Sequence, residues 1–457
     1  MVDHISNPSR WELLQKLVSS TGFRLALITL VGLLMLLPLF LVKQVIQERN
    51  QYHTAVIHDM ATTWGKPQTL IGPVLVIPYV EHIKRVDTIT EPTGEKKVVS
   101  NDTFNDHTLL LLPKELEIRT DIKTEQQRQD MYEALVYQST ISVTGSFDHS
   151  NVLDDGEGER RILWENAYVA FGLSDTKAVD VTSGFFWDNE KVKLEPGSQL
   201  ASLLPTGFHA PLKANTSTEN AHQFKLTLNV RGSEGLFFAP LGETTKLRIT
   251  SAWRHPNFSG HLLPAKHIIN DQGFNAEWQI PYLVRNYPQQ WELDGKQSPD
   301  LNQLTVGVNL EEPDTLYNQL LNAAAYGMVF VGLLFLTLFI LETQILQRPI
   351  AMVHYVLNGL MLAAFYVILL TLAEHIPFLH AYVSAASLTV LILTLYASQL
   401  LTSKKQVAFV ALLLAALYAT LYFLLEQPAY VLPVGTGLLL LTLLGIMYFA
   451  RRAKPVT

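Results

Sequence analysis

Long apolar runs dominate the last third of the chain, and one further run lies near its start. A helix needs roughly 20 apolar residues to cross the ~30 Å hydrocarbon core of a bilayer. Each run is long enough, and the last five have no polar face of the kind that a soluble helix presents to water. The pattern predicts a membrane protein with six transmembrane helices, at residues 25–46, 320–341, 350–372, 379–401, 407–425 and 429–450.

We interpret the first run as a retained membrane anchor rather than a cleaved signal peptide. It is too long for a typical signal-peptide core, and no A-x-A cleavage site follows it. Pro38 lies inside the run and predicts a kink in the helix. Ahead of it, Ser9 and Glu12 fit a capping box, and Trp11, Leu14 and Val18 share one helical face. This segment is either an interfacial helix on the membrane or an extension of the first span.

Residues 47–315 follow a different pattern, in which apolar and polar positions alternate. A period of two predicts half-buried strands of an antiparallel sheet, and Gly-rich turns separate the segments. We expect a β-rich, sandwich-like domain, in one piece or in two lobes split near residues 184–218. One helix is predicted at residues 123–137. The clearest strands are residues 116–122, 224–230, 246–253, 274–280 and 304–310.

The distribution of Lys and Arg orients the predicted spans. Positive charges gather in cytoplasmic loops, and nine lie in the two tails and in alternate links, whereas the opposite short links, 373–378 and 426–428, carry none. The sequence therefore predicts a cytoplasmic tail at 1–24, a first span at 25–46 and a periplasmic domain at 47–315. A five-helix bundle at 320–450 and a cytoplasmic tail at 451–457 complete the prediction.

Composition narrows the range of functions. The 457 residues include no cysteine, which excludes disulfides, thiolate nucleophiles and iron–sulfur clusters. The net charge of −7 argues against a nucleic-acid partner, which would favour a basic surface. We find no zinc-protease, serine-hydrolase or phosphate-loop motif, and we predict neither a catalytic set nor a bound cofactor or metal.

Polar side chains inside the predicted spans are few and stand out against their surroundings. His354 and Asn358 share one face of the third span, and His380 and Ser384 share one face of the fourth. Polar groups in a bilayer are costly, so they either join helices or serve a ligand or proton path. Both interpretations remain open from the sequence alone.

Several stretches resemble the CreD family, inner-membrane proteins of Gram-negative bacteria that are linked to cell-envelope integrity. They are residues 63–79 (TWGKPQTLIGPVLVIPY), 239–260 (APLGETTKLRITSAWRHPNFSG) and 355–382 (YVLNGLMLAAFYVILLTLAEHIPFLHAY). The resemblance covers nearly the whole chain in order. It implies a bacterial inner membrane, a periplasmic central domain, a stress-related envelope role and no catalytic residues.

Two of these stretches supply further candidate residues. Glu374 and His375 lie at a predicted membrane edge, where they can share a proton, bind a cation, cap a helix end or meet lipid headgroups. The first stretch contains Trp64, Gly72 and Pro73, and its Gly and Pro content predicts a fixed, non-helical entry into the first strand. That entry is either a docking floor for the helix bundle or a purely structural feature.

The sequence leaves three functions open. The first is a non-enzymatic envelope protein whose periplasmic domain binds an envelope component or an unknown partner protein, with membrane lipids around the helices. The second is a transporter or channel that uses the polar side chains of the bundle. The third is a membrane-anchored hydrolase that acts on cell wall or lipid.

Overall fold

The computed structural model divides the chain into two compact units. It describes residues 21–90, 96–129, 132–150, 159–180, 182–212, 221–293, 299–310, 316–340, 350–401 and 403–426, with Glu342 and a few positions between 433 and 444. One unit comprises Met1–His53 and Asp314–Thr457, and the other comprises Thr54–Pro313.

The helical unit contains long apolar helices that pack around a common core. Five helical stretches of the described chain are long and apolar enough to cross a membrane. The helices are α2 (Thr21–Leu34), α3 (Leu36–Trp64), α4 (Leu316–Ile340), α5 (Met352–Ala373), α6 (Phe378–Leu400) and α7 (Lys404–Glu426), and the part of α3 after His53 belongs to the second unit. The predicted sixth span, 429–450, and the segment before residue 21 lie outside the described residues, apart from isolated positions. Aromatic side chains fill the centre of this unit, where Phe365 of α5 contacts Tyr382 of α6 and Tyr418 of α7.

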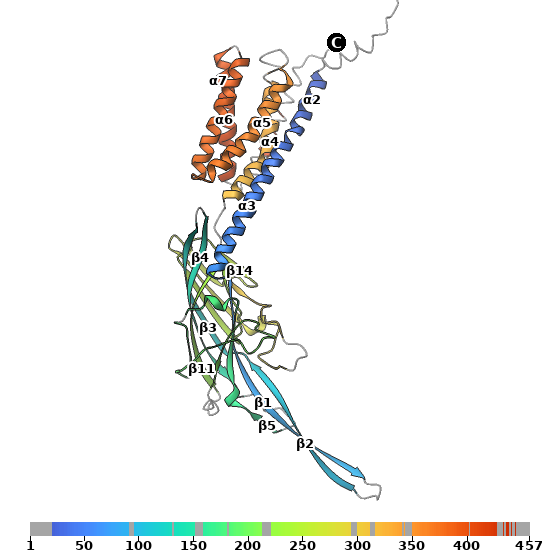
Figure 1. Cartoon of the computed structure of the whole chain (residues 1–457), viewed down its shortest axis with the longest axis vertical. Coiled ribbons are helices and arrows are strands. Elements are labelled where there is room, and N and C mark those ends of the chain that lie inside the picture. The colour runs from blue at the N-terminus through green and yellow to red at the C-terminus, as the bar shows by residue number, and fades with distance from the viewer. Residues whose placement is uncertain are drawn as a thin grey trace, which may run out of the picture. The chain divides into compact units, whose positions relative to one another are not determined.

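The first helix is much longer than its apolar run. Helices α2 and α3 form one stretch that is interrupted only at Met35, in the turn before Pro38 (Figure 1). The candidate span covers 42 residues, or about 63 Å at 1.5 Å per residue, which is roughly twice the hydrocarbon thickness. The predicted boundary at residue 46/47 is therefore wrong as the start of the β-rich domain. The apolar pattern ends there, but the helix continues with polar residues.

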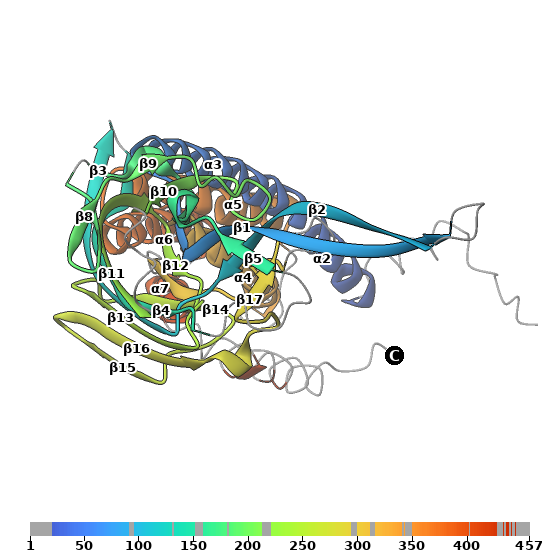
Figure 2. The same cartoon turned by 90° about the horizontal axis from the view of Figure 1, so that it is seen from below.

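The second unit is a sandwich of two β-sheets, as the alternating pattern predicted (Figure 2). The larger sheet has the order β14-β18-β12-β1-β6-β10-β9, with β2 and β5 paired to β1 and β17 paired to β2. Its strands are β1 (Gln68–Thr90), β2 (Lys96–Leu111), β5 (Glu159–Ile162), β6 (Tyr168–Leu173), β9 (Glu195–Pro196), β10 (Gly207–Pro211), β12 (Gly235–Phe238), β14 (Pro256–Gly260), β17 (Gln290–Glu292) and β18 (Val306–Leu310).

The second sheet has eight strands. Its order is β15-β16-β13-β3-β4-β11-β7-β8, and β3 and β13 are its parallel pair. Its strands are β3 (Glu115–Gln129), β4 (Tyr132–Asp148), β7 (Gly184–Trp187), β8 (Glu190–Val192), β11 (Ala221–Ser233), β13 (Thr244–Ser251), β15 (Lys266–Asn270) and β16 (Gly273–Pro281).

A single apolar core lies between the sheets. It joins side chains of both, as where Phe171 of β6 meets the ring of Phe185 of β7 at 5.6 Å. The segment from β7 to β10 passes from one sheet to the other rather than separating two lobes. The two-lobe alternative is therefore wrong, and the described domain is one unit.

Each of the five strands predicted most clearly overlaps an observed strand, although 246–253 runs two residues past the end of β13 and 304–310 starts two residues before β18. The predicted helix at 123–137 is wrong. Those residues form the ends of β3 and β4, paired from Lys123 with Gln138 to Gln129 with Tyr132. Their polar composition favours a helix, but they continue the pairing of β3 with β4, whose other parts contribute side chains to the core. Strand preference depends on such tertiary context, and here it outweighs the helix preference.

Candidate functional sites

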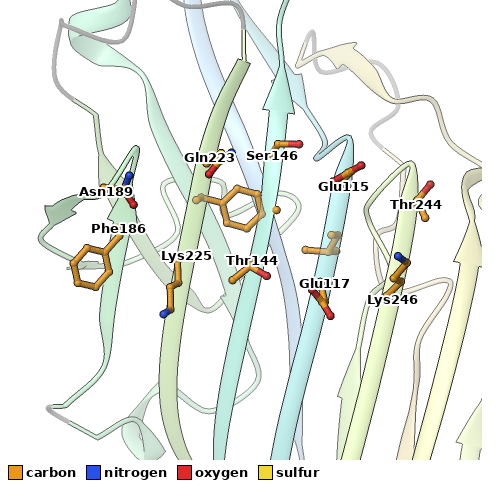
Figure 3. A pocket seen from close by; sticks show the side chains of 13 residues that line it. Glu115, Glu117, Thr144, Ser146, Phe186, Asn189, Gln223, Lys225, Thr244 and Lys246 are labelled. Carbon is orange, nitrogen blue, oxygen red and sulfur yellow. The ribbon is translucent and has the colours of Figure 1, made fainter.

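An open, polar groove crosses the outer face of the eight-stranded sheet. The strand register aligns Phe186 with Lys225, Lys225 with Thr144, Thr144 with Glu117, and Glu117 with Lys246. These five side chains therefore form one row across five strands, and Figure 3 shows them side by side. At 4.7–4.9 Å between strands, the row is about 19 Å long. Alternation places them outward because their neighbours, such as Leu116 and Leu247, fill the core.

A second row lies beside the first and completes the groove. Gln223, Ser146, Glu115 and Thr244 are aligned in the same way. The groove has a volume of about 700 Å³, within the range of known ligand sites. It combines two lysines, two glutamates, several hydroxyl and amide groups, and the partly exposed ring of Phe186. These groups can bind a polar ligand by hydrogen bonds and charge, over a surface long enough for several units of a chain.

No candidate residue from the sequence lies in this groove. Apolar–polar alternation is visible in the sequence, but the register that aligns five strands is not. The two lysines and two glutamates come from three strands whose chain positions range from 115 to 246. Only the alternation within each strand, which marks the side chains that face outward, could have suggested these residues.

Trp64 ends helix α3 and fixes this end of the helix to the β-sandwich. Its indole N–H donates to the carbonyl oxygen of Tyr137 at 3.4 Å, and the guanidinium of Arg231 lies 5.2 Å from its ring. Gly65 follows, and a Cβ there would approach the Arg231 carbonyl oxygen to 2.8 Å. The hydroxyl of Ser233 donates to the Gly65 carbonyl at 2.8 Å. Since Trp64 is helical, the non-helical entry is shorter than the sequence suggested, at residues 65–67.

Buried polar groups strengthen this attachment. The fully buried side chain of Gln68 donates to the carbonyl oxygens of Arg231 and Asp175 and accepts from the Asp175 backbone N–H. The hydroxyl of Tyr137 donates to the Gly235 carbonyl at 2.8 Å, and burial raises the pKa of Tyr137. These bonds fix the chain around Trp64 and Gln68, so we interpret this region as structural.

Gly72 and Pro73 mark the point where β1 changes neighbours. Residues 68–70 pair with β12, whereas pairing with β2 begins at Leu75, and the pairing with β6 shifts register between Ile71 and Val74. Gly72 has φ = +130°, a backbone conformation that strongly favours glycine, and a Cβ there would lie 3.1 Å from the Ala170 carbonyl oxygen. Pro73 has no N–H to donate, which suits an irregular position in a strand.

Inside the helical unit, His354 and Asn358 face a small apolar cavity. The cavity has a volume of about 40 Å³ and is lined by α4, α5, α6 and α7. The Nδ1 atom of His354 contacts the hydroxyl of Tyr396 of α6, and Asn358 donates to the His354 carbonyl at 2.6 Å. A cavity of this size has room for a water molecule. The contact with Tyr396 joins α5 to α6, whereas the bond from Asn358 lies within α5.

His380 and Ser384 lie elsewhere. Both are exposed, on a different face of α6 from its buried residues Ala381 and Ala385. The structure therefore does not bring the four polar side chains of the predicted seam together.

At one end of the bundle, an ion pair joins segments that are far apart in sequence. A guanidinium nitrogen of Arg24 lies 2.9 Å from the carboxylate of Glu342, whose side chain is only 5% exposed. The same nitrogen donates to the Ile350 carbonyl at 3.0 Å, and the Tyr355 hydroxyl donates to Glu342 at 2.9 Å. The network connects α2, residue 342 and α5. Sequence reasoning placed Arg24 in the tail and missed this pair, although a Glu at the end of a span was a visible signal.

Glu374 and His375 are adjacent in sequence but have different partners. Glu374 accepts a hydrogen bond of 3.3 Å from the Tyr317 hydroxyl of α4, and the Tyr317 ring lies 5.1 Å from that of His53 of α3. His375 lies 3.0 Å from the Thr371 carbonyl of its own helix end through Nδ1. Glu374 thus helps to join the helices, whereas His375 caps α5.

Comparison with known proteins connects these features to one family. The family model described as "Inner membrane protein CreD" matches residues 20–454. The chain belongs to the CreD family. It is similar to the inner membrane protein CreD of Escherichia coli (strain K12), with 27% identity over 419 residues, which cover 92% of this chain and 90% of that protein. The resemblance seen in the sequence is confirmed.

Membership of the CreD family shows the membrane to which the chain and its candidate sites belong. The chain is a multi-pass inner-membrane protein of the cell envelope, with apolar helices and a β-rich domain. The match extends over the groove, the Trp64 attachment and the Arg24–Glu342 pair alike. The family description does not suggest catalysis.

Proposed function

We propose that this chain is a non-enzymatic protein that supports cell-envelope integrity, and that its β-rich domain binds an envelope component in the periplasm. The observation that carries the proposal is the groove across the eight-stranded sheet. The lining of this open groove combines both charge signs, hydroxyl groups and an exposed ring. Such a lining suits a polar polymer or a polar face of a protein partner.

The orientation of the chain supports this role. Lys and Arg in the short links favour the cytoplasm for both termini, so the domain between the first two spans faces the periplasm. The bundle then serves as the anchor. A transporter based on the four polar side chains is less well supported, because His380 and Ser384 lie on a different face from the His354–Tyr396 contact.

Charge reversal in the groove tests the proposal. Cells that lack the chain would be complemented with the wild type or with the double variant Lys225→Glu/Lys246→Glu, and their survival in envelope-damaging detergent would be measured. We expect the groove variant to lose most of the protection. The matched control, Lys84→Glu/Lys177→Glu, changes the charge equally at exposed positions outside the groove and should protect like the wild type.

Immunoblots of membrane fractions establish that all variants are present at equal levels. If the groove variant reaches the membrane at the wild-type level and protects as well as the wild type, the groove has no role in envelope integrity and the proposal fails.

A further inference from the structure

Two histidines face each other at the end of the eight-stranded sheet. His149 directly follows β4, and His222 is the second residue of β11, the strand paired with β4. Their Nε2 atoms lie 3.3 Å apart. The Nδ1 atom of His222 lies 2.6 Å from a carboxylate oxygen of Asp188, in the turn after β7. The other carboxylate oxygen of Asp188 accepts the backbone N–H of Gln223 at 2.8 Å, which fixes the carboxylate.

Asp188 determines the protonation pattern of His222. An ionised carboxylate only accepts hydrogen bonds, so Nδ1 of His222 carries the proton and donates it. The Nε2 atom of His222 is therefore unprotonated and can accept a hydrogen bond or bind a metal, and it lies close to the Nε2 atom of His149. Histidines that bind metals in proteins almost always have their other nitrogen held in this way by a carboxylate or carbonyl.

The separation of the two nitrogens fits a shared metal ion. A tetrahedral zinc ion with Zn–N bonds of 2.0–2.1 Å places two nitrogen ligands about 3.3 to 3.4 Å apart. The observed separation is 3.3 Å. The two Nε2 atoms thus already have the separation that a shared metal ion requires, and neither strand has to move.

The surroundings hold both rings in place. His222 is 3% exposed, and its ring stacks on that of Trp187 with the centroids 5.1 Å apart. His149 contacts the ring of Trp164 at 4.7 Å and stacks on His222 at 5.3 Å. The four rings form a continuous series from Trp164 to Trp187. His149 is partly exposed, which gives an ion access from solvent.

We propose that His149 and His222 bind one first-row transition metal ion, such as Zn²⁺, Ni²⁺ or Cu²⁺, through their Nε2 atoms. Imidazole nitrogens suit these ions. Asp188 is a positioning residue that holds His222 in the binding tautomer, and His149 binds when its proton is on Nδ1. Among the described residues no group of three His, Cys, Asp or Glu that could hold a metal ion gathers at this place, so the proposed site is defined by these two histidines. The site is independent of the ligand proposed for the groove.

Metal titration of the full chain in detergent tests this inference. The protein would carry an affinity tag without histidine and would be treated with a chelator beforehand. Cu²⁺ and Ni²⁺ quench nearby indoles, so tryptophan fluorescence should fall to a plateau at one equivalent because of Trp164 and Trp187. Calorimetry with Zn²⁺ should give one site per chain.

Three variants separate the site from other effects. His149→Ala should remove the one-equivalent step, and Asp188→Asn, which preserves shape, should weaken binding by about 10- to 100-fold. His267→Ala removes a histidine on the edge strand β15, far from the pair in sequence, and should bind like the wild type. If wild type and His149→Ala give the same curve, or if the wild type shows no saturable site, the pair is only a hydrogen bond between two histidines and the inference fails.

Discussion

Tyr287 is a residue whose hydroxyl is buried with no hydrogen-bond partner in the described part of the chain. Its ring lies 5.4 Å from the guanidinium of Arg285, which donates to the Leu241 carbonyl and to Gln289. Burial raises the pKa of Tyr287 to about 12, and the positive charge of Arg285 offsets part of this effect. An ionised phenolate would be unfavourable here, so the domain should be sensitive to alkali at this position.

Tyr287→Phe should change stability little at neutral pH, because the lost hydroxyl has no partner. The folded pKa is raised above the ordinary value near 10, so the stabilisation from the neutral phenol is complete below about pH 10 and is lost between about pH 10 and pH 12. The variant cannot ionise, so it should be roughly 2 kcal/mol more stable than the wild type near pH 12.

Unfolding of the full chain in detergent at a series of pH values would measure this difference. Other tyrosines titrate equally in both proteins, so only the difference between the two curves is informative. A stability difference that stays constant from neutral to alkaline pH would contradict the assignment.

At the scale of elements, the Arg24–Glu342 pair joins the first helix to the rest of the bundle. Glu342 is 5% and Arg24 is 22% exposed, and a charge left without its partner in such a site is costly. The Tyr355 hydroxyl and the Ile350 carbonyl complete the hydrogen bonds of the pair. The contact therefore fixes how α2 packs in the bundle.

Arg24→Met should lower the stability of the bundle by about 2 to 3 kcal/mol, because Glu342 would stay buried without compensation. Adding Glu342→Gln should restore most of this loss, since glutamine still accepts the bond from Tyr355. A double-mutant cycle on the full chain in detergent measures the coupling. Lys405→Met, which removes an exposed charge in α7, is the control. Additive effects of the two changes would show that the pair does not couple the helices.

For the whole molecule, the number and direction of membrane crossings decide which compartment contains the groove. Arg24 belongs to helix α2 and is paired, so eight rather than nine positive charges remain in the tails and links on the predicted cytoplasmic side. The opposite short links still have none, so the predicted direction is unchanged.

Reporter fusions should reveal six crossings with the β-sandwich outside. Alkaline phosphatase, which is active only in the periplasm, should be active when fused after Thr218 and after Glu426. Green fluorescent protein, which fluoresces only when it folds in the cytoplasm, should be bright after Thr457. A dark fusion at Thr457 would mean that residues 429–450 do not cross, and an inactive phosphatase at Thr218 would reverse the whole orientation.

Local patterns were sufficient to predict the class of fold. Burial in lipid requires a continuous apolar run, and a half-buried strand requires alternation, so both properties appear in neighbouring residues. The same reasoning failed at residues 123–137, where pairing between β3 and β4 outweighs helix propensity. It also failed to find the end of the first helix, because a helix continues beyond the bilayer without any apolar pattern.

The sequence alone determined that this chain spans a membrane and has a β-rich domain between its first two spans, because those features depend on residues close together in the chain. Only the tertiary structure decided which side chains meet. Arg24 and Glu342, His149 and His222, and the five strands of the groove are brought together by helix packing and strand register. These depend on the closure of long loops, and no local pattern of residues encodes them.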